Sequence, residues 1–147
     1  MKLQPLVIEG PHGKLVLGPR FVAVPRQVNP PCRFIEVFAQ CGAFQGDKSC
    51  YPLEEDFQSF CSDLAALSLN GTGAARLSCG ANDELLIVVS SSDVEGVFTV
   101  QAQILQDIEI HGSLTRPFRQ EARISFWVER AALAKAIAAS WLAGPGS

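Results

Sequence analysis

The chain has few of the residues on which recognisable catalytic and cofactor sites depend. Only two of its 147 residues are histidine, and its five cysteines are spaced too widely for a zinc ribbon or a Cys-x-x-Cys redox pair. A catalytic cysteine needs a histidine or another cation nearby to lower its pKa, whereas His12 and His111 both lie in turn-like sequence. We therefore expect no catalytic motif, no cofactor and no metal, and we interpret the chain as non-enzymatic.

Other absences bear on partners and compartment. Lysine and arginine number 12 against 15 aspartates and glutamates, and a net charge of −3 argues against a nucleic-acid surface, which needs a basic face. No run approaches the ~20 apolar residues of a membrane span, and the first residues lack the apolar core of a signal peptide. We expect a cytoplasmic protein that contacts neither membrane nor nucleic acid, and we expect its cysteines to be free thiols.

What the second half does contain is a period of two residues. Residues 85–89 are a short, wholly apolar run, turn-rich sequence follows from Ser90 to Gly96, and apolar and polar residues alternate in 97–104 and 122–128. This alternation predicts antiparallel strands with one buried and one solvated face. From Leu133 the apolar spacing becomes helical through Ile137 and Trp141, and residues 144–146 supply a helix stop.

The first half follows a looser version of the same plan. Strands are predicted at 3–8, 14–17, 21–24 and 34–44, and a helix at 53–69 with an acidic first turn and a stop at Asn70-Gly71. The apolar stripe of this helix is expected to bury five residues, namely Phe57, Phe60, Cys61, Leu64 and Leu67. The sequence thus predicts an α+β fold in which an antiparallel sheet, or two curved sheets, packs on two helices, with a hint of a pseudo-repeat.

The whole chain, residues 1–147, is interpreted as one such domain. Residues 143–147 are expected to be a flexible tail, or residues 144–147 an addition to the natural chain. Cys41 and Cys50 are expected to face each other across a hairpin through residues 42–47, where they could form an adventitious disulfide.

One constellation places an imidazole beside carboxylates. Asp107, Glu109 and His111 share one face of an extended segment, within a connection, 107–120, that is longer than an ordinary hairpin loop. The alternative function is therefore a small-molecule-binding or enzymatic domain with a pocket under this connection. Its lining would include these three residues together with Arg116 and Arg119.

A resemblance carries the leading hypothesis. The chain contains, in order, the acidic-start helix, Ala-Arg-Leu-Ser, Asn-Asp-Glu-Leu-Leu-Ile-Val-Val, Gly-Val-Phe-Thr-Val-Gln-Ala-Gln-Ile and Phe-Trp-Val-Glu, followed by a Leu-x-x-x-Ile helix. This order of elements resembles that of small bacterial families. Some of these are similar to WapI-like immunity proteins, which are encoded beside polymorphic toxins. The resemblance covers residues 53–142 and implies a bacterial accessory or neutralising protein that works by binding; it carries no site residues over.

The leading hypothesis is therefore a protein-binding domain that sterically occludes a partner. The residues expected to contact that partner are acidic or aromatic: Glu54, Glu55, Asp56, Asp93, Glu95 and Trp127. Trp127 alternates away from Phe126 and Val128, so it either covers a second layer or is exposed for the partner, and we favour the core position. Self-association through an exposed strand remains a further alternative.

Overall fold

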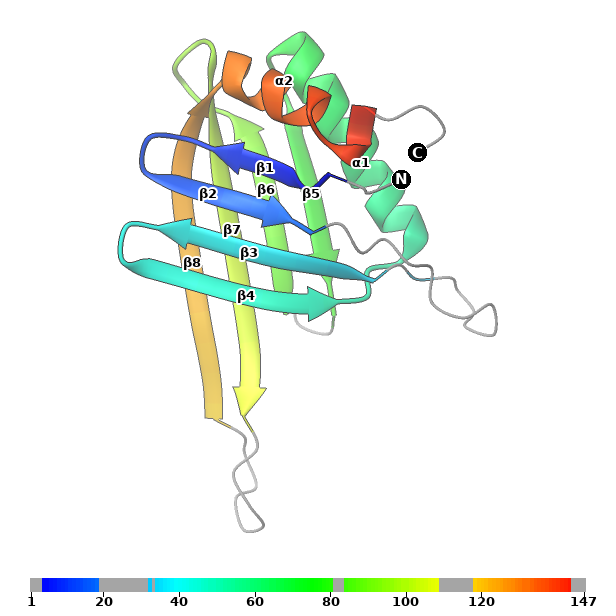
Figure 1. Cartoon of the computed structure of the whole chain (residues 1–147), viewed down its shortest axis with the longest axis vertical. Coiled ribbons are helices and arrows are strands. Elements are labelled where there is room, and N and C mark those ends of the chain that lie inside the picture. The colour runs from blue at the N-terminus through cyan, green and yellow to red at the C-terminus, as the bar shows by residue number, and fades with distance from the viewer. Residues whose placement is uncertain (1–3, 19–31, 33, 81–83, 109–117, 144–147) are drawn as a thin grey trace.

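The computed structural model describes residues 4–18, 32, 34–80, 84–108 and 118–143, and it contains two antiparallel sheets and two helices. Each sheet is a meander in chain order, followed by a helix (Figure 1). Sheet 1 comprises β1 (Leu6–Glu9), β2 (Gly13–Leu17), β3 (Ile35–Cys41) and β4 (Phe44–Cys50) and precedes α1 (Glu54–Asn70). Sheet 2 comprises β5 (Ala74–Cys79), β6 (Leu85–Ser91), β7 (Val97–Ile108) and β8 (Phe118–Glu129) and precedes α2 (Arg130–Ala138). The predicted α+β class is confirmed, and of the two arrangements that the sequence left open, one sheet or two, the structure has two.

The two sheets pack face to face with their strands crossing steeply, as Figure 1 shows. β2, β3 and β4 all contact β8, and β4 also contacts β7. Alternate residues of each strand fill the space between the sheets, including Leu15 and Val37 from sheet 1 and Ile87 and Val100 from sheet 2. α1 packs on β5 and α2 packs on β1, so each helix packs on the first strand of the other half.

The first helix matches its prediction closely. Phe57, Phe60, Cys61, Leu64 and Leu67 are all buried, as the apolar stripe indicated. Gly71 ends the helix with a φ of 80°, a left-handed conformation that glycine adopts without steric cost, and its N–H donates to the Leu67 carbonyl at 2.8 Å.

The strand predicted over residues 34–44 is wrong in its extent. β3 ends at Cys41, Gly42 turns the chain with a φ of 60°, and β4 begins at Phe44. The polar sequence of β4 conceals a strand because its inner-facing positions include Gly46 and Lys48 in place of apolar side chains. Cys41 pairs with Phe44 and Cys50 with Ile35, so these cysteines lie at opposite ends of the hairpin and the expected 41–50 contact does not form.

The second helix also differs from its prediction. α2 begins at Arg130, before Leu133, and ends at Ala138. Ser140 terminates it, because its hydroxyl donates to the Ile137 carbonyl at 2.8 Å and accepts the Leu142 N–H at 3.2 Å. Trp141 therefore lies in a short 3₁₀ turn, Trp141–Ala143, from which its ring stacks on Phe57 with 5.5 Å between centroids.

Strands β7 and β8 extend further than the alternation indicated. Their pairing runs from Val97 opposite Glu129 to Ile108 opposite Phe118, so both ends of the expected 107–120 connection belong to strands. The predicted strand at 21–24 lies outside the described residues, as do residues 144–147 of the predicted tail 143–147, whose first residue, Ala143, belongs to the 3₁₀ turn. No helix in the described part of the chain is long and apolar enough to cross a membrane.

Candidate protein-binding surface

The two hairpin turns of sheet 1 reach the edge of β8. Gly10 lies so close that a Cβ atom there would be 2.0 Å from the Trp127 carbonyl oxygen. Two residues before Trp127 on β8, the Ser125 carbonyl accepts a hydrogen bond from the Cys41 thiol at 3.4 Å. The turns are joined by a hydrogen bond from the Gly42 N–H to the His12 carbonyl at 3.3 Å. Part of the β8 edge is therefore covered by backbone, which holds the turns in place.

Three ring-bearing residues, His12, Phe44 and Trp127, lie along this side of the molecule, and we call them the aromatic edge. The His12 and Trp127 rings meet edge to face with 6.3 Å between centroids. Trp127 is 38% exposed and Phe44, which pairs with Cys41 beside the turn, is 75% exposed. The core position that we favoured for Trp127 is wrong, because its side chain lies on the outer face of sheet 2 and is partly exposed there beside the His12 ring.

Between the turns lies a small depression of about 220 Å³. Its lining combines the backbone of the glycine-rich turn with the charged residues Glu9 and Lys14 and with His12 and Gln40. The Lys14 ammonium also lies 5.7 Å from the centre of the Phe38 ring on the outer face of sheet 1. The aromatic edge is thus flanked by both signs of charge.

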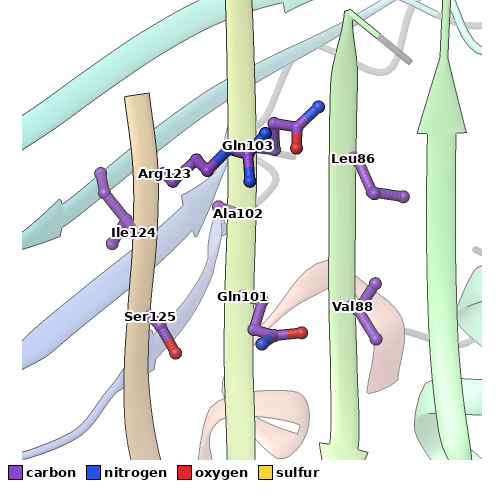
Figure 2. A pocket seen from close by; sticks show the side chains of 8 residues that line it. All are labelled: Leu86, Val88, Gln101, Ala102, Gln103, Arg123, Ile124 and Ser125. Atoms are coloured by element: carbon purple, nitrogen blue, oxygen red, sulfur yellow. The ribbon is translucent and has the colours of Figure 1, made fainter. Parts of the chain in front are cut away.

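A second depression, of about 270 Å³, opens on the outer face of sheet 2 (Figure 2). Leu86 and Val88 supply its apolar part, and the polar part comes from Gln101, Gln103, Arg123 and Ser125. Arg123 forms an ion pair with Glu121 on the same strand. This surface was not predicted from the sequence. Its residues occupy the outward-facing positions of the strands, which the sequence analysis treated only as a solvated face. It continues toward Trp127, two positions beyond Ser125 on the same face of β8.

The predicted acidic residues are not brought together. Asp93 and Glu95 are exposed in the turn between β6 and β7, with exposed Val94 between them. This turn lies at the end of sheet 2 where Trp127 pairs with Thr99. Three of the predicted partner-binding residues therefore share one end of the sheet.

Glu54, Glu55 and Asp56 form the first turn of α1, where Glu54 accepts a hydrogen bond from the Gln58 amide at 2.9 Å. The C-terminus of α1 adjoins Ala74, whose partner Ser90 is near the β6–β7 turn, so the first turn of α1 lies at the opposite end. A helix of 17 residues is about 25 Å long. The structure thus separates this acidic turn from Asp93 and Glu95.

The residues predicted for the alternative pocket are mostly outside the described chain. Asp107 and Arg119 are backbone partners in the register of β7 and β8, whereas Glu109, His111 and Arg116 lie outside the described residues. A concavity of about 510 Å³ does occur in the angle between β4 and the β7–β8 pair. Its lining consists of Gln45, Gly46, Asp47, Ile104, Gln120, Glu121 and Ala122.

Metal-ligating side chains do not cluster: within the described ranges, no group of three or more His, Cys, Asp or Glu side chains could hold a metal ion. Comparison of the chain with models of protein families, with curated proteins and with solved structures gives no match. The function is therefore inferred from the surfaces of this chain.

Proposed function

We propose that this protein binds another protein through the aromatic edge and neutralises it by steric occlusion, in the manner of an immunity protein. The observation that carries the proposal is the exposure of two large apolar rings, Trp127 and Phe44, on a scaffold that holds them in position. Trp127 is fixed by strand pairing and by the His12 ring. Tryptophan is among the residues most often found to dominate binding energy at interfaces.

The energetics favour a partner at this surface. Complete burial of a Phe side chain is favourable by about 1.5–3 kcal/mol relative to leaving it exposed, and Phe44 keeps most of its surface in water in the free protein. Because strand pairing already orders the backbone that carries these rings, binding needs no further ordering of the backbone, which makes the same contact area more effective.

Neighbouring charges favour a basic partner. Asp93 and Glu95 lie at the same end of sheet 2 as Trp127, and the whole chain carries a net charge of −3. Acidic groups on the rim of an interface accelerate encounter with a basic surface and select against acidic ones. The depression with Leu86 and Val88 enlarges the contact area beside the aromatic core.

The test compares two ends of the molecule. The wild-type protein, a Trp127→Ala variant and a matched Tyr51→Ala variant, which removes an exposed ring next to the first turn of α1 without changing the charge, are used to capture partners from the native lysate, and the captured protein is titrated by calorimetry. We expect one stoichiometric partner whose affinity falls at least about 30-fold in Trp127→Ala and is kept in the control, since a hot-spot residue contributes about 2 kcal/mol or more. Equal affinities of the two variants, or no stoichiometric partner, would contradict the proposal.

The second candidate function is binding of a small polar molecule in the concavity beside β4. Its volume of about 510 Å³ is within the range of ligand sites, and the carboxylate of Asp47 favours a cationic ligand. A panel of small amines is screened by thermal shift against the wild type, Ala122→Leu, which narrows the concavity, and Trp127→Ala as the control. A midpoint increase that is lost only in Ala122→Leu would favour this function; no increase with any amine would count against it.

A further inference from the structure

Side chains on the outer face of sheet 2 form a regular grid. Each of two neighbouring cross-strand rows places an apolar side chain on β6, an amide on β7 and a polar side chain on β8. The rows are Val88, Gln101 and Ser125, and Leu86, Gln103 and Arg123. From the spacing of strands and of alternate residues, the grid measures about 7 Å along the strands and about 10 Å across them. It forms the depression of about 270 Å³ that Figure 2 shows.

The polar groups in the middle of this depression are open to a ligand. Within the described ranges, the side-chain amides of Gln101 and Gln103 and the Ser125 hydroxyl form no hydrogen bond. Both glutamine side chains lie on β7, between the side chains of β6 and those of β8 (Figure 2). An amide group donates and accepts hydrogen bonds, as a hydroxyl group of a ligand also does. The two glutamines therefore suit a ligand with several neighbouring hydroxyl groups.

The lining has no uncompensated charge. Of the residues that border the depression, Arg123 alone is ionisable, and its Nε donates to the Glu121 carboxylate two positions away on β8. Both side chains are solvent-exposed, so the pair contributes little to stability, but it balances the charge beside the amides. The other guanidinium N–H groups of Arg123 remain able to donate to a neutral oxygen. The site thus favours a neutral ligand over an anion or a cation.

The apolar side of the depression restricts the ligand further. Leu86 and Val88 are two positions apart on β6 and half-buried, so they present a small apolar surface next to the amides. C–H groups of a ligand gain free energy by leaving water there. The amides, in contrast, lose free energy on burial unless the ligand replaces their hydrogen bonds to water. A sugar ring meets both requirements, because it has a C–H face and a rim of hydroxyl groups.

We propose that this depression is a binding site for one ring of a neutral saccharide. The C–H face of the ring packs on Leu86 and Val88, and its hydroxyl groups form hydrogen bonds with the two glutamine amides and with Arg123. Saccharide binding here does not require the proposed protein partner, because these side chains are not part of the aromatic edge.

A longer saccharide also reaches Trp127. The Trp127 side chain lies one row beyond Ser125 on the same face of β8, at a spacing of about 7 Å, and it is 38% exposed. The face of an indole ring is apolar and electron-rich, so the C–H groups of a second sugar ring pack favourably on it. We therefore expect a chain of sugars to bind more tightly than a single sugar.

NMR titration of the isolated wild-type protein tests the proposal. Neutral mono- and tetrasaccharides of glucose, galactose, mannose and N-acetylglucosamine are added to the isotope-labelled protein, and backbone and glutamine side-chain amide signals are followed. We expect saturable shifts centred on Gln101, Gln103 and Ser125 with at least one tetrasaccharide. No saturable shift with any saccharide, shifts centred on sheet 1, or tighter binding of glucuronate or galacturonate than of the neutral parent sugar would overturn the proposal. No protein partner is present, so a negative result leaves the proposed protein binding intact.

Two double variants show whether the glutamines form the site. Gln101→Ala/Gln103→Ala should weaken binding at least about tenfold, because two hydrogen bonds to the saccharide are lost. Gln40→Ala/Gln45→Ala is the matched control, since it removes a cross-strand pair of glutamines from sheet 1, and it should keep the wild-type affinity. Amide signals outside the altered strands check that both variants fold. Equal affinities of the two double variants would refute the assignment.

Trp127→Ala examines the extension of the site. It should reduce the advantage of the tetrasaccharide over the monosaccharide and leave the shifts at Gln101 and Gln103 in place. An unchanged advantage would refute the contact with Trp127.

Discussion

The first half of the molecule and the second half share one order of elements, four meandering strands followed by a helix, but their helices contribute unequally. α1 has 17 residues and buries five of them, including two phenylalanines, whereas α2 has nine residues and buries only Leu133. The strands show the reverse inequality, because β7 and β8 have 12 residues each and the strands of sheet 1 have at most seven. The halves are therefore similar in plan and complementary in what each supplies.

Complementarity also appears in how the halves exchange helices. α1 follows sheet 1 yet packs on β5, and α2 follows sheet 2 yet packs on β1. Each sheet buries one face against the other sheet, so neither half contains a closed core of its own. This exchange explains why a chain with two similar halves forms one domain.

Separating the halves should have the largest effect. Fragments 1–72 and 73–147 each lose the inner face that covers their sheet, and we expect neither to give a cooperative unfolding transition alone. Mixing them should restore the circular dichroism of the intact chain. A fragment that alone gives a cooperative unfolding transition and a near-ultraviolet circular dichroism signal from packed aromatic side chains would show that the two halves do not depend on each other for folding.

Removal of one buried side chain from each helix should show the inequality between them. Phe60→Ala is expected to lower the free energy of unfolding by about 3–5 kcal/mol, because Phe60 is fully buried between α1 and the sheets. Leu133→Ala in α2 should cost about 2–3 kcal/mol, since Leu133 is also fully buried but truncation of a leucine removes less apolar surface than truncation of a phenylalanine. Urea denaturation measures both, and a larger loss for Leu133→Ala would reverse the ranking.

The close approach of the β1–β2 turn to β8 should be sensitive to one methyl group. In Gly10→Ala the new Cβ would lie 2.0 Å from the Trp127 carbonyl oxygen, which belongs to the backbone of β8, so the turn must move away, at a cost of about 3 kcal/mol, the upper end of the usual range for overpacking. Gly42→Ala in the other turn of sheet 1 is the control: it meets no atom within 4 Å, and its positive φ costs only about 1–2 kcal/mol. Chemical denaturation with matched m-values would compare them; equal losses would show that the approach is not constrained.

The smallest effect is expected where the second half caps the helix of the first. The Arg130 guanidinium donates to the carbonyls of Ser68 and Leu69 at the C-terminus of α1, where the helix dipole favours a positive charge. Arg130→Ala should lower the free energy of unfolding by about 0.5–1.5 kcal/mol, and Arg130→Lys should recover part of this loss. Lys135→Ala, at the end of α2, is the control with little change; a loss as large as that of Arg130→Ala would argue for a general effect of charge.

Elements with a strong local period were predictable from the sequence. The helix stripe from Phe57 to Leu67 and the alternation from Phe98 to Ile104 identify buried faces, because both faces are strongly apolar. β4 was not recognised, since a lysine and a glycine occupy inner positions that apolar residues fill elsewhere. Of the residues on the candidate surface, Trp127, Asp93 and Glu95 were named from the sequence as partner-binding candidates, and His12 and Phe44 were not. The position of a turn residue on the surface depends on which distant strand the turn approaches, and the local sequence does not show this.

By itself the sequence determined the class of fold, the two-part plan and the residues that face inward, because these follow from periodicities of two and 3.6 along the chain. Tertiary structure alone decided that the sheets cross, that the helices exchange halves and that His12 meets Trp127. A local period reports which side of an element avoids water. It carries no information on which distant element covers that side, since apolar faces attract one another without directional preference and the choice depends on how all of them pack together.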